Sequence, residues 1–114
     1  MYIYNTGNID KQGRLCLSGS YGNDETLYFY VEINNRNERF IHVQNFKMEK
    51  VKCESAKVDG KGRVIIPKWI RDFLGFANVA IINFKSEGGK TTLTVIDADK
   101  IEEYAKNYKT EETS

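Results

Sequence analysis

The chain carries the pattern Asp-x-x-Gly-Arg twice, and this repetition constrains its fold more than any other feature. The first copy runs from Asp10 to Arg14 and the second from Asp59 to Arg63, an offset of 49 residues. Recurrence at a fixed spacing is typical of a chain built from similar units. With 114 residues, the chain has room for one compact domain. The repeat therefore predicts two half-units, each of about fifty residues, that share one core.

Both halves predict the same order of strands and turns. In the first half, "LYFYVEINN" and "RFIHVQNF" are β-rich and flank the turn "NRNE". In the second half, "NVAIINF" and "TTLTVID" flank "KSEGGK", where Gly88 and Gly89 suit a tight reversal. Each Asp-x-x-Gly-Arg segment predicts a stiff turn, because glycine takes a backbone conformation that side chains disfavour while the Asp accepts N–H groups or holds the Arg.

The connection that follows each turn differs between the halves. The second half predicts a short core-facing helix with Pro67 as its first residue and Gly75 as its stop. Its apolar stripe consists of Trp69, Ile70, Phe73 and Leu74. The first half has "SGSYGNDET" at the equivalent place, and its Gly, Ser and Asn residues favour turns over a helix. The first half-unit is therefore expected to be degenerate.

The C-terminal stretch predicts an amphipathic helix. Asp99 and Glu102 have the spacing of a capping box, and Ile101, Tyr104 and Tyr108 fall along one face. We therefore expect a mainly β protein with short helices. Its parts are a degenerate half-unit at residues 1–50, a second half-unit at 51–96, and an acidic helix with a frayed tail at 97–114.

The net charge of +1 conceals an uneven distribution of charged side chains. Residues 1–50 hold six basic and six acidic side chains, residues 51–96 hold eight and four, and residues 97–114 hold three and six. A basic middle segment fits a polyanion-binding surface, and it also fits an ordinary solvated face. The candidate DNA contacts are Lys57, Lys61, Arg63, Lys68 and Arg71, joined by Lys11 and Arg14 if the two halves pack about a pseudo-twofold axis.

Residues 57–76 resemble the AbrB-like swapped-hairpin regulators, a group that includes SpoVT, many antitoxins and the two-copy MraZ proteins. The second half carries the resemblance through Val58, Asp59, Gly62, Arg63, Val64, Ile66, Pro67, Ile70, Arg71, Leu74 and Gly75. The first half carries it only through Ile9, Asp10, Gly13, Arg14, Leu15 and Leu17. The sequence departs from the family pattern at two places: Asp72 stands where some relatives have a second Arg, and "ANVAI" replaces a common Gly-Asp.

The resemblance implies a swapped-hairpin barrel built from the two tandem half-units as a pseudo-dimer. It also implies a sequence-specific double-stranded DNA-binding protein that regulates transcription. Arg63 and Arg71 match positions that contact DNA in the family, and Lys57 lies beside another. Homo-oligomers are expected. The alternative is an antitoxin-like or scaffold protein that uses the barrel for dimerisation and the acidic C-terminal helix for a protein partner.

The sequence gives little support for an enzyme, a cofactor site or a metal site, and we expect no catalysis, cofactor or metal. "EGGKTT" lacks the upstream glycine of a phosphate-binding loop, because Phe84 stands in its place. Cys16, Cys53 and the single His42 cannot furnish a four-ligand zinc site, and His42 is expected as a solvated strand residue. The sequence shows neither a membrane span nor a signal peptide, so we expect a cytoplasmic protein.

Overall fold

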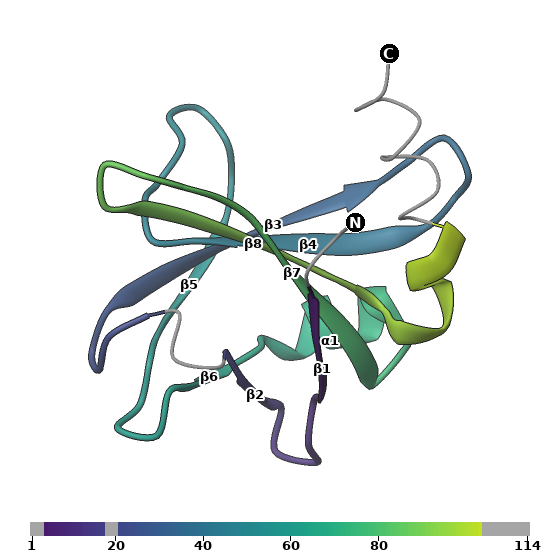
Figure 1. Cartoon of the computed structure of the whole chain (residues 1–114), viewed down its shortest axis with the longest axis horizontal. Helices are drawn as coiled ribbons and strands as arrows, with labels where there is room; N and C mark the ends of the chain where they lie inside the picture. Colours follow the sequence, from purple (N-terminus) through teal and green to yellow (C-terminus); the bar gives the residue numbers. More distant parts are fainter. Residues whose placement is uncertain (1–3, 18–20, 104–114) are drawn as a thin grey trace.

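The computed structural model describes residues 4–17 and 21–103, and it is mainly β, as expected (Figure 1). Its strands are β1 (Tyr4–Asn8), β2 (Arg14–Cys16), β3 (Thr26–Ile33), β4 (Arg39–Gln44), β5 (Glu54–Lys57), β6 (Arg63–Ile65), β7 (Asn78–Glu87) and β8 (Lys90–Asp97). The helical elements are α1 (Lys68–Leu74) and a 3-10 turn, η1 (Ala98–Lys100), which residues 101–103 continue. None of the helices in these described residues is long and apolar enough to span a membrane.

The strands form two antiparallel sheets. Six strands lie in the order β1-β7-β8-β4-β3-β5, and β2 pairs with β6 in a separate two-stranded sheet. The first strand of each half lies beside the hairpin of the other half, since β1 pairs with β7 and β5 pairs with β3. The strands do not close into the barrel implied by the family resemblance. The short end strands β1 and β5 lie at opposite edges, and the chain leaves each of them at an Asp-x-x-Gly-Arg turn to form the β2–β6 pair.

The β2–β6 pair has local twofold character. Leu15 lies opposite Val64, which is 64 − 15 = 49 positions further along the chain. The pair is extended by two equivalent hydrogen bonds, from Leu17 N to Gly62 O at 3.0 Å and from Ile66 N to Gly13 O at 2.7 Å. Leu17 and Ile66 differ by the same 49 positions, as do Gly13 and Gly62. The repeat in the sequence thus corresponds to equivalent backbone contacts.

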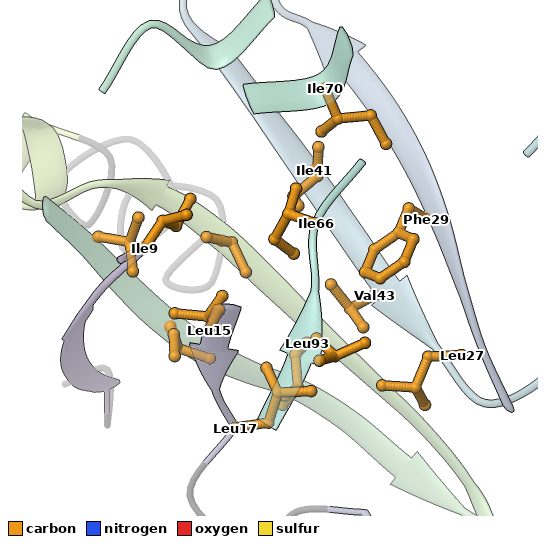
Figure 2. Close-up of a cluster of buried hydrophobic side chains, with 14 of the residues drawn as sticks. Ile9, Leu15, Leu17, Leu27, Phe29, Ile41, Val43, Ile66, Ile70 and Leu93 are labelled. Carbon is orange, nitrogen blue, oxygen red and sulfur yellow. The ribbon is translucent and has the colours of Figure 1, made fainter. Parts of the chain in front are cut away.

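The main core lies between the six-stranded sheet and the layer formed by β2, β6 and α1 (Figure 2). Figure 2 shows Leu15, Leu17, Ile66 and Ile70 facing Phe29, Ile41, Val43 and Leu93 of the sheet. A smaller cluster consists of Phe40, Ala80, Ile82, Ile96 and Ile101. Successive residues of β7 alternate between the two clusters, as expected for a strand that is buried on both faces. Burial of these apolar side chains is the main force that holds the two layers together.

Several local predictions are confirmed. The turn between β7 and β8 contains Gly88 and Gly89 at φ 59° and 82°, in the left-handed region that a tight hairpin requires. Helix α1 ends at Gly75, whose φ is 73°. The described part of "SGSYGNDET", residues 21–26, is non-helical, whereas residues 18–20 lie outside the described part of the chain.

Three local predictions need correction. Trp69 was expected in the apolar stripe of α1, but it is 49% exposed, because the helix packs through Ile70 and Leu74. Pro67 is the residue before the helix and not its first residue. The carboxylate of Asp97, and not that of Asp99, caps η1 by accepting from the Asp99 N–H group at 3.0 Å. Of the predicted C-terminal helix, Tyr104 and Tyr108 lie outside the described residues.

Tyr21 replaces the missing helix of the first half. It stands 49 positions before Ile70 and is buried like that residue. Its hydroxyl group lies 2.9 Å from Val43 O and 3.0 Å from Thr91 O, so it can donate to either carbonyl. Burial raises the pKa of Tyr21, so the hydroxyl keeps its proton at neutral pH. A single anchored aromatic side chain therefore fills, in the first half, the core position that α1 fills in the second.

Candidate nucleic-acid interface

The two Asp-x-x-Gly-Arg turns have the same hydrogen bonds. In the first turn, Asp10 Oδ1 accepts from the N–H groups of Gln12 and Arg14, both at 2.9 Å. Its other oxygen, Oδ2, accepts from Arg14 Nε at 2.8 Å. One carboxylate thus holds both the backbone of the turn and the side chain that closes it.

The second turn repeats this arrangement around Asp59. The Oδ1 atom accepts from the N–H groups of Lys61 and Arg63, both at 2.9 Å, and Oδ2 accepts from Arg63 Nε at 2.9 Å. The bound backbone N–H groups, chiefly that of Arg14 for Asp10 and that of Arg63 for Asp59, hold the pKa of each carboxyl below its ordinary value. Both aspartates are therefore ionised at neutral pH and keep their arginines in place.

The outer face of the β2–β6 pair presents both arginines. Because alternate residues of a strand point to opposite faces, Leu15 enters the core while Arg14 and Cys16 point outward. On the paired strand, Arg63 and Ile65 occupy the corresponding outward positions, opposite Cys16 and Arg14 respectively. The two arginines are therefore diagonal neighbours, a relation in which residues are typically about 7–8 Å apart and long side chains can reach the same ligand.

Each arginine keeps donor groups for a ligand. Of each guanidinium, the aspartate occupies only the Nε atom, and within the described residues the Nη groups of Arg14 and Arg63 form no hydrogen bond. The Nη groups of a guanidinium form a planar fork that matches a phosphate or the edge of guanine. Figure 1 shows both turns, between β1 and β2 and between β5 and β6, at the bottom of the view and on the same side of the molecule. One ligand could therefore contact both.

Arg71 reaches from α1 to the turn of the other half. Its Nε donates to Ile66 O at 3.0 Å, and its guanidinium lies against Gly13, where an added Cβ would be 2.8 Å from Arg71 Cζ. Gly13 also has φ 82°, which disfavours any side chain. The position 49 residues earlier than Arg71 is Gly22, so the first half has no equivalent side chain. The sequence indicated Arg71 as a contact but did not predict its position over Gly13, because this packing joins distant parts of the chain.

The four predicted lysines are spread around this surface. Lys11 and Lys61 are exposed at the two turns. Lys57, at the end of β5, lies 3.9 Å from the carboxylate of Asp24, and Lys68 lies 3.2 Å from that of Asp72. These ion pairs are highly exposed and therefore weak, so a polyanion could replace the carboxylates. The structure thus groups Lys11, Lys61 and the three arginines, whereas Lys57 and Lys68 already have acidic neighbours.

Replacing Gly13 by alanine tests the position of Arg71. We expect Gly13→Ala to destabilise the fold by about 2–3 kcal/mol, because it adds left-handed backbone strain to displacement of the guanidinium. The matched control is Gly75→Ala, which has a similar φ of 73° but open space around the added Cβ, so it should cost only about 1–2 kcal/mol. Urea unfolding of both variants measures the difference. Equal losses would show that Arg71 does not depend on the space over Gly13.

The low carboxyl pKa values predict how stability depends on pH. A group whose pKa is lowered by folding contributes stability above its unfolded value, and that contribution is lost as the pH falls through the folded value. We therefore expect stability to decrease as the pH falls below about 4. The double variant Asp10→Asn, Asp59→Asn should lose part of this dependence, since it lacks both titrating groups. Urea unfolding between neutral pH and pH of about 2.5 measures it, and an unchanged pH dependence in the variant would contradict the assignment.

His42 differs from the sequence expectation of a solvated strand residue. It is half-buried, with Nδ1 2.9 Å from Thr94 Oγ1 and Nε2 2.8 Å from Glu32 Oε1. Thr94 is fully buried, whereas Glu32, at the other end of this chain of contacts, is exposed. Within the described residues, no three His, Cys, Asp or Glu side chains are grouped as metal ligands would be. Cys16 and Cys53 are free thiols, the first exposed and the second half-buried.

Comparisons with models of protein families, with curated proteins and with solved structures found no match for this chain.

Proposed function

We propose that the protein binds double-stranded DNA in a sequence-specific manner and regulates transcription. The observation that carries this proposal is the pair of Asp-anchored turns that present Arg14 and Arg63 on one outward face. Because each aspartate fixes the arginine at Nε, the guanidinium loses little further conformational freedom when it binds. The arginines are suited to reading base edges, and the exposed Lys11 and Lys61 are suited to contacting phosphates.

The swapped-hairpin relation between the half-units is part of the same proposal. It is supported by the exchange of first strands, since β1 lies beside β7 and β5 lies beside β3. The equivalent contacts of the β2–β6 pair also support a pseudo-dimer within one chain. In this arrangement each half provides one cationic turn, and Arg71 adds a third guanidinium on one side only. We further propose a cytoplasmic homo-oligomer, which the mass in solution would test.

The salt dependence of binding tests the phosphate contacts. If about four to six phosphates are neutralised, the logarithm of the association constant should fall with the logarithm of salt concentration at a slope of roughly −4 to −5. Fluorescence anisotropy with a labelled random-sequence duplex measures this slope. The Lys61→Ala variant should make it shallower by about 1. A slope near zero would contradict the proposal, because contacts to the DNA backbone release counterions.

A further inference from the structure

A second surface lies away from the two turns. It is a groove of about 730 Å³ between β3, α1 and the connection from β4 to β5. Phe29, Val31, Val51 and Trp69 form its apolar lining. Figure 1 shows the β4–β5 connection at the top of the view, whereas both turns lie at the bottom. The groove is therefore available for a ligand other than the proposed duplex.

Exposed apolar side chains are concentrated around this groove. Within the described residues, the large hydrophobic side chains that remain exposed are Val31, Ile33, Met48, Val51, Ile65 and Trp69. All except Ile65 line the groove or belong to the strand and connection that border it. A cluster of exposed apolar side chains is typical of an interaction site, because contact of these side chains with water is unfavourable. This concentration distinguishes the groove from the rest of the described surface.

The edge of β3 beside the groove is open. Strand β5 pairs only with Thr26 to Phe29, whereas β3 continues to Ile33. Beyond Phe29, no described strand pairs with this edge of β3. Backbone groups on an open edge can accept another extended chain by strand addition, and pockets for alternate side chains then give specificity. Val31 belongs both to this edge segment and to the groove.

The charge of the groove selects the kind of chain that fits. Lys47, Lys50 and Lys52 line it, and none of them forms an ion pair with another described residue. The one acidic side chain among its described lining residues is Glu54, whose Oε1 accepts from Trp69 Nε1 at 3.1 Å. The lining therefore carries an excess of positive charge next to apolar side chains. Acidic residues alternating with apolar ones would complement both properties.

We propose that this groove binds an extended acidic and apolar segment of a partner protein, which adds a strand to β3 beyond Phe29. Apolar side chains of the segment pack on Val31 and Trp69, and its carboxylates lie near Lys47 and Lys52. The indole edge is held by Glu54, which leaves the ring as a wall of the groove. Alternate side chains of a peptide strand can be apolar and pack on this lining, whereas a nucleic acid strand has a phosphate at every step, so a peptide fits this groove better.

Trp69 makes the proposal directly measurable, because it is the only tryptophan in the chain. The probe is a short acetylated peptide of alternating Glu and Val, titrated into the full-length protein while tryptophan emission is recorded. We expect a saturable change with this peptide and none with the matched Lys and Val peptide. Methylation of alternate backbone nitrogens in the Glu and Val peptide should abolish binding, because it removes the donors needed for strand addition.

Charge-reversed variants separate this site from the proposed DNA surface. The double variant Lys47→Glu, Lys52→Glu should weaken peptide binding about tenfold or more while leaving duplex binding unchanged. The matched control Lys61→Glu should weaken duplex binding and leave peptide binding unchanged. If the wild-type protein binds the Glu and Val peptide but no duplex, the DNA proposal is contradicted and this one is unaffected.

Three results would overturn the inference. The first is equal binding of the Glu and Lys peptides. The second is a change in Trp69 emission produced by a single-stranded oligonucleotide but not by the Glu and Val peptide. The third is a concentration-dependent change in Trp69 emission that accompanies dimer formation without peptide, because a second copy would then cover the groove.

Discussion

Replacing Arg63 by alanine should weaken binding to a selected duplex by about 1–3 kcal/mol, which is about 5- to 150-fold in affinity. Asp59 holds Arg63 Nε at 2.9 Å, so the wild-type guanidinium meets the DNA in a fixed orientation that alanine cannot reproduce. The duplex is first selected from a random pool with the wild-type protein. Anisotropy titrations then compare the selected duplex with a scrambled one.

Two matched variants are needed to interpret the result for Arg63→Ala. Arg14→Ala removes the equivalent side chain of the first turn, and a similar loss would indicate that both turns contact the duplex. Lys61→Ala should weaken binding to selected and scrambled duplexes alike, because a flexible lysine contacts phosphates. If Arg63→Ala weakens both duplexes equally, then Arg63 reads no bases. The free energy of unfolding of Arg63→Ala, measured with urea, should be nearly that of the wild type, because the ion pair that is lost is partly exposed and joins residues only four positions apart.

Replacing Leu15 by alanine should destabilise the fold by about 2–5 kcal/mol. Leu15 is fully buried at the centre of the β2–β6 pair, opposite Val64, and it packs on the six-stranded sheet (Figure 2). Its truncation leaves a cavity where the two layers meet, and the paired backbone limits how far the surroundings can relax. Urea unfolding monitored by circular dichroism measures the change in the free energy of unfolding.

Ile65→Ala is the matched control for Leu15→Ala. Ile65 belongs to the same two-stranded sheet, but its side chain points outward and is 57% exposed. Its truncation should therefore change the free energy of unfolding by only about 0.5 kcal/mol or less. If both variants lose the same stability, the β2–β6 pair does not pack on the sheet as described.

The features that could be predicted from the sequence depend on neighbouring residues. Gly88 and Gly89 predicted a hairpin, and Gly75 predicted a helix end, because each position requires a backbone conformation that glycine adopts readily. The two Asp-x-x-Gly-Arg turns were predicted for the same reason. Their hydrogen bonds link residues no more than four positions apart, so the pattern contains all the participants.

The features that could not be predicted depend on distant residues. Apolar spacing placed Trp69 in the core, but spacing alone does not tell which side of a short helix meets the sheet. The position of Arg71 over Gly13 joins α1 to the other half of the chain. The groove was also missed, although the basic run "KMEKVK" at residues 47–52 is a signal for it. Its open strand edge follows from the length of β5, which the sequence pattern did not define.

The neighbours of β1 and β5 determine how the protein could be divided. A cut in the exposed connection at residues 47–52 would yield two fragments, each containing one strand that belongs beside the hairpin of the other. Either fragment alone would leave its hairpin without that edge strand and its apolar layer in water. The fragments should therefore regain structure only together. In the proposed pseudo-dimer, the connection at residues 47–52 would make the association of the two halves unimolecular.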